Sequence, residues 1–142
     1  MIVVVVDASV AVKWFIAEDN ANDALKLLGK NYELHAPDLL FLEVDNVLCK
    51  LIRRGLLSEV EGFDIHNKIL AFPIRSYPSQ NFREEAFHMA IGTKRSVYDC
   101  LYLALAEALD GHLVTADGKV FQAFGNSPQR NRMLWVGDLL GA

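Results

Sequence analysis

The chain has 142 residues, 52% of them apolar and 10% aromatic, which fits one globular domain with its own core and excludes a disordered chain. Its 14 basic and 18 acidic residues give a net charge of −4, which taken alone argues against a nucleic-acid partner. No apolar run approaches the roughly 20 residues of a membrane span, and the first apolar run lacks the basic start of a signal peptide. We therefore expect a single domain over residues 1–142 in a cytoplasmic protein.

The cysteines and histidines do not form a zinc-binding pattern. Cys49 and Cys100 both fall in apolar helical stretches, where a thiol usually packs as a small core side chain. The four histidines have no ligand spacing to one another or to a cysteine. We expect neither a disulfide nor a zinc ion.

The chain opens with five consecutive β-branched residues, Ile2 to Val6. Such a run is typical of a parallel strand that is covered on both faces. Asp7 follows at the carboxyl end of this strand, and Ser9 is placed to cap the next helix. The alternative is that Asp7 itself is the cap and has no further role.

A second strand is expected over Tyr32 to Ala36, followed by a long helix that Gly55 ends. Within this helix Glu43 lies beside the apolar face, and Asn46 follows one turn later. A glutamate at the edge of a buried stripe is often only structural, so Glu43 alone decides nothing. Asp45, two residues further, is expected in solvent.

The middle of the chain has ordinary helix and strand signals. Ser58 with Glu61 predicts a capping box and a helix behind it. A short strand over Ala71 to Ile74 and a helix that starts at Asn81 and ends at Gly92 are expected next.

A later helix from Val97 to Leu109 is apolar on every face, and Asp99 lies in its first turn. A buried carboxylate needs hydrogen bonds, a cation or an exposed helix end, because burial without partners costs several kcal/mol. A capping box with Ser96 is the ordinary explanation for Asp99. The strand His112 to Thr115 follows, and Asp117 lies just past its carboxyl end.

The order of these elements favours an α/β fold, with a mostly parallel sheet between helices. A helix around Val120 and a last strand over Met133 to Val136 complete it. In such a sheet the carboxyl ends of the strands lie at one edge, where α/β proteins place their sites. Asp7 and Asp117 should meet there, each two positions from a hydroxyl residue.

Three stretches of the sequence resemble the PIN-domain nucleases, and within them the VapC-type toxins of toxin–antitoxin modules. They are VVVDASVAVKWF at the start, APDLLFLEVDNVLCKLIRRG in the middle and YDCLYLALAEALDGHLVTADGKVF late in the chain. The resemblance implies a three-layer α/β/α fold, usually a homodimer, with endoribonuclease activity and a small inhibitory antitoxin. It also implies a pocket that binds Mg²⁺ or Mn²⁺ through Asp7, Glu43, Asp99 and Asp117, with Ser9, Asn46 and Thr115 at supporting positions.

The chemistry of such a pocket follows from its charges. Carboxylates that lie close together repel unless a divalent cation is among them, and a set of oxygen ligands suits Mg²⁺ or Mn²⁺. We expect Asp7 and Asp99 to ligate the main ion, with Glu43 and Asp117 completing its shell directly or through water. Of these, Asp117 is the least uniform position in the family.

Without these four acids the chain has 14 acidic and 14 basic residues, so its remaining surface can offer basic patches to RNA. Alternatively, the basic residues Lys50, Arg53 and Arg54 only complement the dipole at the end of the helix that contains Glu43. The candidates are Lys13, Lys50, Arg53, Arg54, Lys94, Arg95 and Lys119.

Four other functions compete with this interpretation. A haloacid-dehalogenase-type phosphotransferase needs a second aspartate where Ser9 stands, and a receiver-type signalling domain needs an acid at the end of its middle strand. A non-catalytic binding or regulatory module would not need all four acids. A structure-specific DNA nuclease would need the same acids and is the principal enzymatic alternative.

Overall fold

A computed structural model describes residues 1–140, and its centre is a five-stranded sheet in which every pair of neighbouring strands is parallel. The strand order is β3-β2-β1-β4-β5. The strands are β1 (Ile2–Val6), β2 (Tyr32–Pro37), β3 (Ile74–Tyr77), β4 (His112–Thr115) and β5 (Met133–Trp135).

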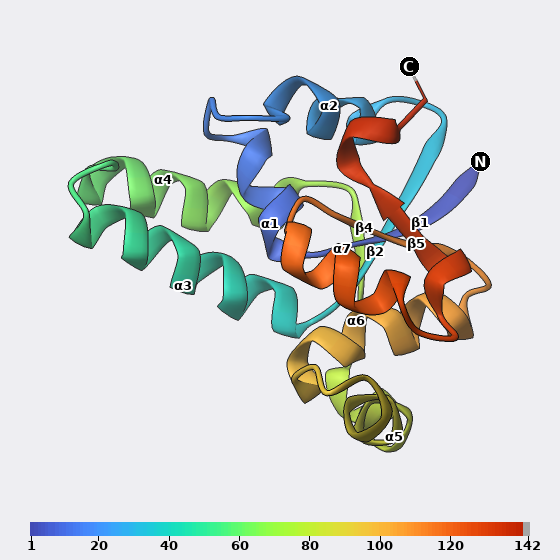
Figure 1. Cartoon of the computed structure of the whole chain (residues 1–142). Coiled ribbons are helices and arrows are strands. Elements are labelled where there is room, and N and C mark those ends of the chain that lie inside the picture. Colours follow the sequence, from blue (N-terminus) through green and yellow to red (C-terminus); the bar gives the residue numbers. More distant parts are fainter. Residues whose placement is uncertain (141–142) are drawn as a thin grey trace.

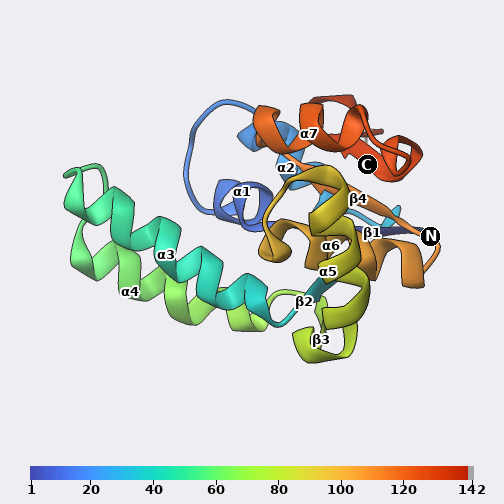
Figure 2. The same cartoon turned by 60° about the horizontal axis from the view of Figure 1, so that its bottom comes forward.

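The helices of the described chain connect these strands (Figure 1). In two views, α3 and α4 lie side by side and extend together to one side of the sheet (Figure 2). The helices are α1 (Ala8–Ala11), α2 (Ala21–Leu25), α3 (Leu39–Arg53), α4 (Glu59–Lys68), α5 (Arg83–Thr93), α6 (Val97–Ala108) and α7 (Gly118–Gly125).

The sheet is covered on both faces. Val4, Val5 and Val6 are consecutive in β1 and all are 0% exposed, although successive side chains of a strand point to opposite faces. Helix α6, whose side chains from Cys100 to Ala106 are all buried, packs on β1, β2 and β4. The expected three-layer α/β/α arrangement is therefore confirmed.

The parallel pairing brings distant parts of the sequence to one edge. Val6 in β1 is paired in register with Val114 in β4, so the residues that follow both strands leave the sheet side by side. Asp7 begins one of these exits, and Thr115 ends the other strand. Helices α3 and α6 start near the same edge, which is where the sequence placed the site.

Local details differ from the sequence prediction at three places. Strand β3 begins at Ile74 rather than Ala71, because α4 continues as a 3₁₀ turn through Ala71. Asn81 lies in another 3₁₀ turn and does not cap α5, which begins at Arg83. Cys49 is exposed on α3, whereas Cys100 is buried as expected.

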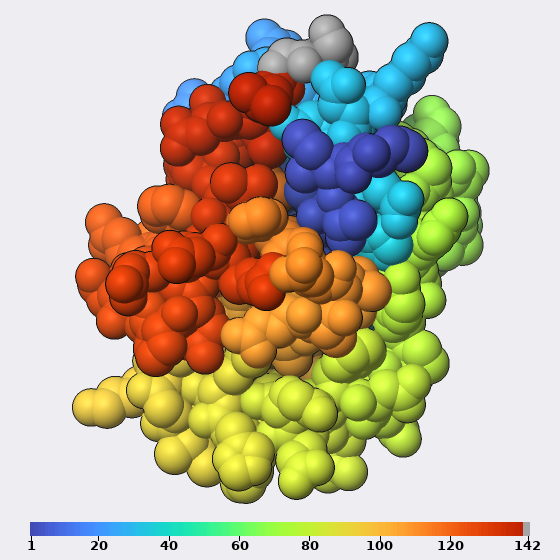
Figure 3. All heavy atoms as spheres, turned by 90° about the vertical axis from the view of Figure 1, so that its right-hand side faces the viewer, coloured from blue at the N-terminus to red at the C-terminus, as the bar shows by residue number. Residues whose placement is uncertain are grey.

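The C-terminal end of the described chain contacts the start of β2, at the opposite edge of the sheet. The Tyr32 hydroxyl accepts a hydrogen bond from the backbone N–H of Leu140 at 2.9 Å. Figure 3 shows the start of β1 exposed on this side of the molecule, next to the segment that leads into β2. Within residues 1–140, no helix has both the length and the apolar character needed to cross a membrane.

Candidate active site

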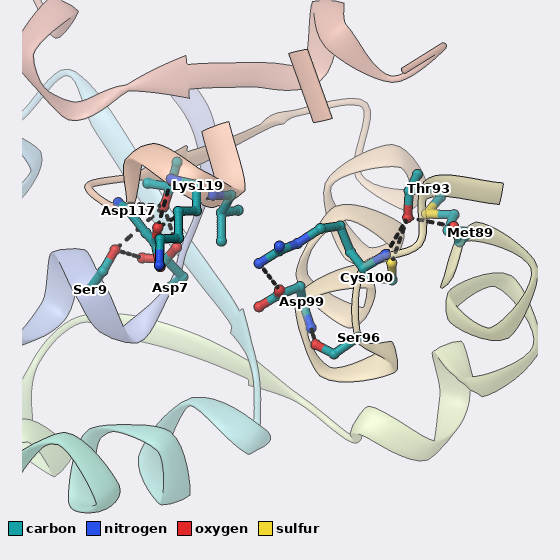
Figure 4. A network of polar contacts seen from close by, with 12 residues as sticks. Asp7, Ser9, Met89, Thr93, Ser96, Asp99, Cys100, Asp117 and Lys119 are labelled. Carbon is teal, nitrogen blue, oxygen red and sulfur yellow. Dashed lines mark hydrogen bonds and ion pairs between the residues drawn. The ribbon is translucent and has the colours of Figure 1, made fainter. Parts of the chain in front are cut away.

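A cavity of about 260 Å³ opens at the carboxyl edge of the sheet, and all four acids that the sequence selected line it. Asp7 follows β1, and Glu43 lies in α3. Asp99 lies in the first turn of α6, and Asp117 precedes α7. Figure 4 shows Asp7 and Asp117 close together, with Asp99 on α6 across from them. The polar and charged lining residues are Asp7, Ser9, Glu43, Asn46, Lys50, Asp99, Tyr102 and Asp117.

Asp7 is held by hydrogen bonds on both carboxylate oxygens. Ser9 Oγ donates to Oδ1 at 2.5 Å, and Thr115 Oγ1 donates to Oδ2 at 2.6 Å. The backbone N–H of Val10 also donates to Oδ1, which makes Asp7 the N-cap of α1. The prediction that Ser9 caps this helix is wrong. Ser9 instead accepts from the backbone N–H of Ala116 and ties the β1 and β4 exits together.

Burial raises the pKa of Asp7 from 3.8 to about 6. The hydrogen bonds from Ser9, Thr115 and Val10 oppose this shift, and the charge of Glu43 adds to it. Desolvation dominates because the surrounding protein covers much of the Asp7 side chain, although the residue is only partly buried. Asp7 is therefore mostly ionised near neutral pH, and a nearby positive charge would stabilise that ionised form.

Glu43 is anchored from the facing helix. The Tyr102 hydroxyl donates to Glu43 Oε1 at 2.5 Å, and Tyr102 is only 2% exposed. Burial raises the pKa of Glu43, the Tyr102 hydrogen bond lowers it, and the charge of Asp99 raises it. Burial together with the charge of Glu43 also raises the pKa of Tyr102, so its hydroxyl stays protonated as a donor.

Tyr102 is the residue that sequence reasoning missed. Its position three residues after Asp99 places it on the same side of α6 as Asp99. A tyrosine within an otherwise aliphatic buried helix was the available signal, because a buried phenol usually has a hydrogen-bond partner.

Asp99 has a cationic partner. Arg95 Nη2 donates to Asp99 Oδ2 at 2.9 Å, and the two side chains are 29% and 27% exposed. Ser96 Oγ accepts from the backbone N–H of Asp99 at 3.0 Å and caps α6, whereas the Asp99 carboxylate bonds Arg95 and not the other half of the predicted capping box. The cap uses the backbone of Asp99, so its carboxylate remains available to the cavity.

Asp117 serves as a helix cap as well as a cavity wall. Its Oδ1 accepts from the backbone N–H groups of Lys119 at 2.9 Å and Val120 at 3.3 Å, at the start of α7. Its backbone N–H donates to Thr115 Oγ1, which links it to the Asp7 network. Helix capping therefore accounts for one of the two carboxylate oxygens of Asp117.

The predicted basic residues differ in their availability. Lys13 is paired with Glu18 at 3.1 Å and its side chain is only 12% exposed, which does not favour contact with a phosphate. Lys50 lines the cavity, two helical turns after Glu43. Arg95 is paired with Asp99, as described above. The exposed candidates outside the cavity lining are Arg53, Arg54, Lys94 and Lys119.

Asp45 does not lie free in solvent as expected. Its Oδ1 is 2.7 Å from His66 Nδ1, so the pair connects α3 to α4 on the outside of the helix pair. Sequence patterns could not predict this contact, because the two residues belong to different helices. Asp45 remains separate from the cavity lining.

The donor chemistry of the cavity fits a hard divalent ion that keeps much of its water. Within residues 1–140, no three His, Cys, Asp or Glu side chains are placed so that they can hold an ion together. Mg²⁺ commonly contacts only one or two carboxylates and keeps several water molecules. The carboxylate oxygens of the lining and the volume of the cavity meet that requirement, although Lys50 also lines the cavity and Arg95 is already paired with Asp99.

An all-parallel sheet with four acids around one cavity at its carboxyl edge defines an α/β protein with an acidic, ion-compatible site. The PIN domain family model matches residues 4–126, and the chain belongs to the PIN-domain family. Ribonuclease VapC3 of Pyrobaculum aerophilum is 34% identical over 122 residues, which cover 84% of this chain and 93% of that protein.

Further relatives agree with this membership. Ribonuclease VapC12 of Mycobacterium tuberculosis is 32% identical over 127 residues, covering 89% of this chain and 95% of that protein. A toxin–antitoxin complex from Klebsiella pneumoniae contains a chain with a TM-score of 0.63 to this one at 15% identity, covering 92% of this chain and 95% of that one. The last likeness supports the fold only.

Proposed function

We propose that this protein is an endoribonuclease that hydrolyses RNA phosphodiester bonds with Mg²⁺ or Mn²⁺, and that it is the toxin of a toxin–antitoxin pair. The observation that carries the proposal is the convergence of Asp7, Glu43, Asp99 and Asp117 on one cavity from four separate elements. Two relatives that align along most of their length are named ribonucleases, which supports RNA as the substrate.

The residues have separate roles in this proposal. Asp7 and Asp99 hold the ion, while Glu43 and Asp117 orient water around it. When bound, the ion supplies an activated water and neutralises charge on the phosphate. Asn46 lines the same cavity and offers an amide to the water shell or to the RNA. Ser9 and Thr115 act through Asp7, because their hydrogen bonds fix its orientation.

The test compares cleavage of one labelled RNA and of the matching DNA in Mg²⁺, Mn²⁺ and EDTA. We expect RNA cleavage that EDTA stops, and we expect Asp7→Asn and Asp99→Asn to reduce it to background while the fold is retained by circular dichroism. Asp19→Asn, at an exposed position outside the cavity, is the matched control.

Each other outcome contradicts a named part of the proposal. Full metal-dependent activity in both cavity variants would show that the catalytic residues are assigned wrongly. Cleavage of DNA alone would favour the structure-specific DNA nuclease. RNA binding without cleavage under any ion would favour a non-catalytic module.

Two protein partners belong to the proposal. A small antitoxin would cover the α3–α4 pair, in which and in whose connecting segment Leu42, Leu56, Val60 and Phe63 are 68%, 70%, 81% and 68% exposed. Large apolar side chains left exposed on one helix pair are candidates for a protein contact. Co-expression with the product of an adjacent small reading frame should stop RNA cleavage, and Phe63→Asp should weaken that inhibition.

A second copy of the chain would pack on the surface that α5 and the start of α6 form. Phe87, Ile91 and Tyr98 are 60%, 67% and 61% exposed there. A homodimer would bury these side chains and so gain hydrophobic free energy.

A further inference from the structure

Arg95 holds an acid that the proposed ion also needs. Its guanidinium contacts Asp99 through a single hydrogen bond, Nη2 to Oδ2 at 2.9 Å. Asp99 lines the cavity, and Arg95 precedes it by four residues, at the junction of α5 and α6. The bond therefore places a positive charge at the wall of the cavity.

The guanidinium is incompletely satisfied in this position. Arg95 Nε is buried and has no hydrogen-bond partner, and the bond to Asp99 is the one that the structure gives to the side chain within residues 1–140. A guanidinium has five N–H donors, and a buried donor without a partner costs free energy. This arrangement can therefore be exchanged for one in which Arg95 meets an anion with more acceptors.

The backbone of Arg95 is held by its own hydrogen bond, whereas its guanidinium is held by the ion pair with Asp99. The Arg95 N–H donates to Thr93 Oγ1 at 3.3 Å, and Thr93 Oγ1 donates to the carbonyl of Met89 at 2.7 Å (Figure 4). The residue before Arg95, Lys94, has a left-handed backbone with φ +60°, which ends α5 sharply. A release of Asp99 would thus leave the guanidinium at the rim of the cavity.

We infer that a divalent ion and Arg95 compete for Asp99, and that the displaced Arg95 then binds a phosphate of the RNA. This inference rests on the metal site of the proposed function. A doubly charged ion attracts the carboxylate more strongly than a guanidinium does at similar distance. A phosphate offers acceptor oxygens that the Arg95 fork can bind in pairs, which a single carboxylate oxygen does not.

The exchange couples the two ligands. In the free protein Arg95 lowers the affinity for the ion, because its positive charge repels the ion and its hydrogen bond occupies Oδ2 of Asp99. Once RNA is present, Arg95 has a new partner and this cost falls. By linkage, RNA and the ion then strengthen each other's binding by the same factor.

The first measurement is Mn²⁺ binding to the protein without RNA, by titration calorimetry and by the loss of the free-ion electron paramagnetic resonance signal. Arg95→Met keeps the aliphatic stem and removes the charge, and we expect it to bind Mn²⁺ roughly five- to tenfold more tightly than wild type. Arg95→Lys should stay within about twofold of wild type, since it retains the charge. Lys94→Met is the matched control, with the same net charge change but no pairing to Asp99, and should also resemble wild type.

The second measurement is the salt dependence of binding to a labelled 12-nucleotide single-stranded RNA, whose integrity is checked after each titration. In EDTA, wild type and Arg95→Met should give the same slope of log affinity against log salt concentration. In Mn²⁺ the slope of Arg95→Met should be smaller by about 0.7, the value for one phosphate contact on a single strand.

The outcomes separate this inference from the proposed function. If wild type binds Mn²⁺ and Arg95→Met binds it equally tightly or more weakly, the inference is overturned and the metal site still stands. Equal salt slopes in Mn²⁺ would overturn the contact of Arg95 with phosphate. If neither protein binds Mn²⁺ at millimolar concentration, both the metal site and the exchange are wrong.

Discussion

Asp7→Asn should stabilise the protein in the absence of divalent ions while removing its proposed activity. Burial raises the pKa of Asp7 from 3.8 to about 6, which corresponds to about 3 kcal/mol of unfolding free energy at pH values above both. The sign follows from linkage. Because the folded state binds this proton more tightly than the unfolded state does, the wild-type protein loses stability as the pH rises from about 4 through about 6.

Asparagine cannot ionise, so the variant avoids that loss. Its amide replaces one acceptor oxygen by a donor, which costs about 1 kcal/mol if Thr115 must turn its hydroxyl to accept it. The net gain at pH 7.5 is therefore about 2 kcal/mol. The hydrogen-bond cost does not depend on pH, so the advantage of the variant should shrink by about 2 kcal/mol between pH 7.5 and pH 4.5.

The assay is urea unfolding in EDTA, followed by the fluorescence of Trp14 and Trp135 at several pH values. Asp19→Asn, at an exposed position, serves as the control and should follow wild type throughout. An Asp7→Asn protein that is less stable than wild type at pH 7.5, or whose advantage is the same at both pH values, would refute the reasoning from burial.

Other substitutions test the remaining parts of the site. Tyr102→Phe removes the hydrogen bond that lowers the pKa of Glu43, so the acidic limb of the pH–rate profile should move to higher pH and kcat/KM should fall about tenfold, as measured by RNA cleavage. Thr115→Val removes a donor from the buried carboxylate of Asp7 and should lower the unfolding free energy by about 1–3 kcal/mol in urea titrations at pH 7.5. Phe87→Glu should turn the proposed homodimer into a monomer by sedimentation, and an unchanged mass would exclude the α5 surface as the dimer contact.

The sequence was sufficient to place Asp7 and Asp117 at one edge, and the reason is geometric. A run of β-branched residues that ends in an acid predicts a buried parallel strand, and all parallel strands end at the same edge. The exact pairing of β1 with β4 was not required for this prediction. Asp99 followed from the cost of a carboxylate in an apolar helix.

The contacts between helices could not be predicted in the same way. Tyr102 meets Glu43 across 59 positions of sequence, and this distance depends on how α3 and α6 are rotated against each other. Local patterns specify the apolar stripe of each helix and leave that rotation open. Strand β3 was misplaced for a related reason, since the residues after α4 continued its helical turn rather than starting the strand.

The structural and functional explanations of the acids turn out to be compatible. Asp7 caps α1 and Asp117 caps α7, yet both line the cavity. Capping bonds orient a carboxylate before any ligand arrives, and hydrogen bonds to the charged form favour ionisation. A capping role is therefore no argument against an ion site. The same bonds that begin the helices pre-organise the acids, and the remaining desolvation cost at Asp7 is what a bound cation would offset.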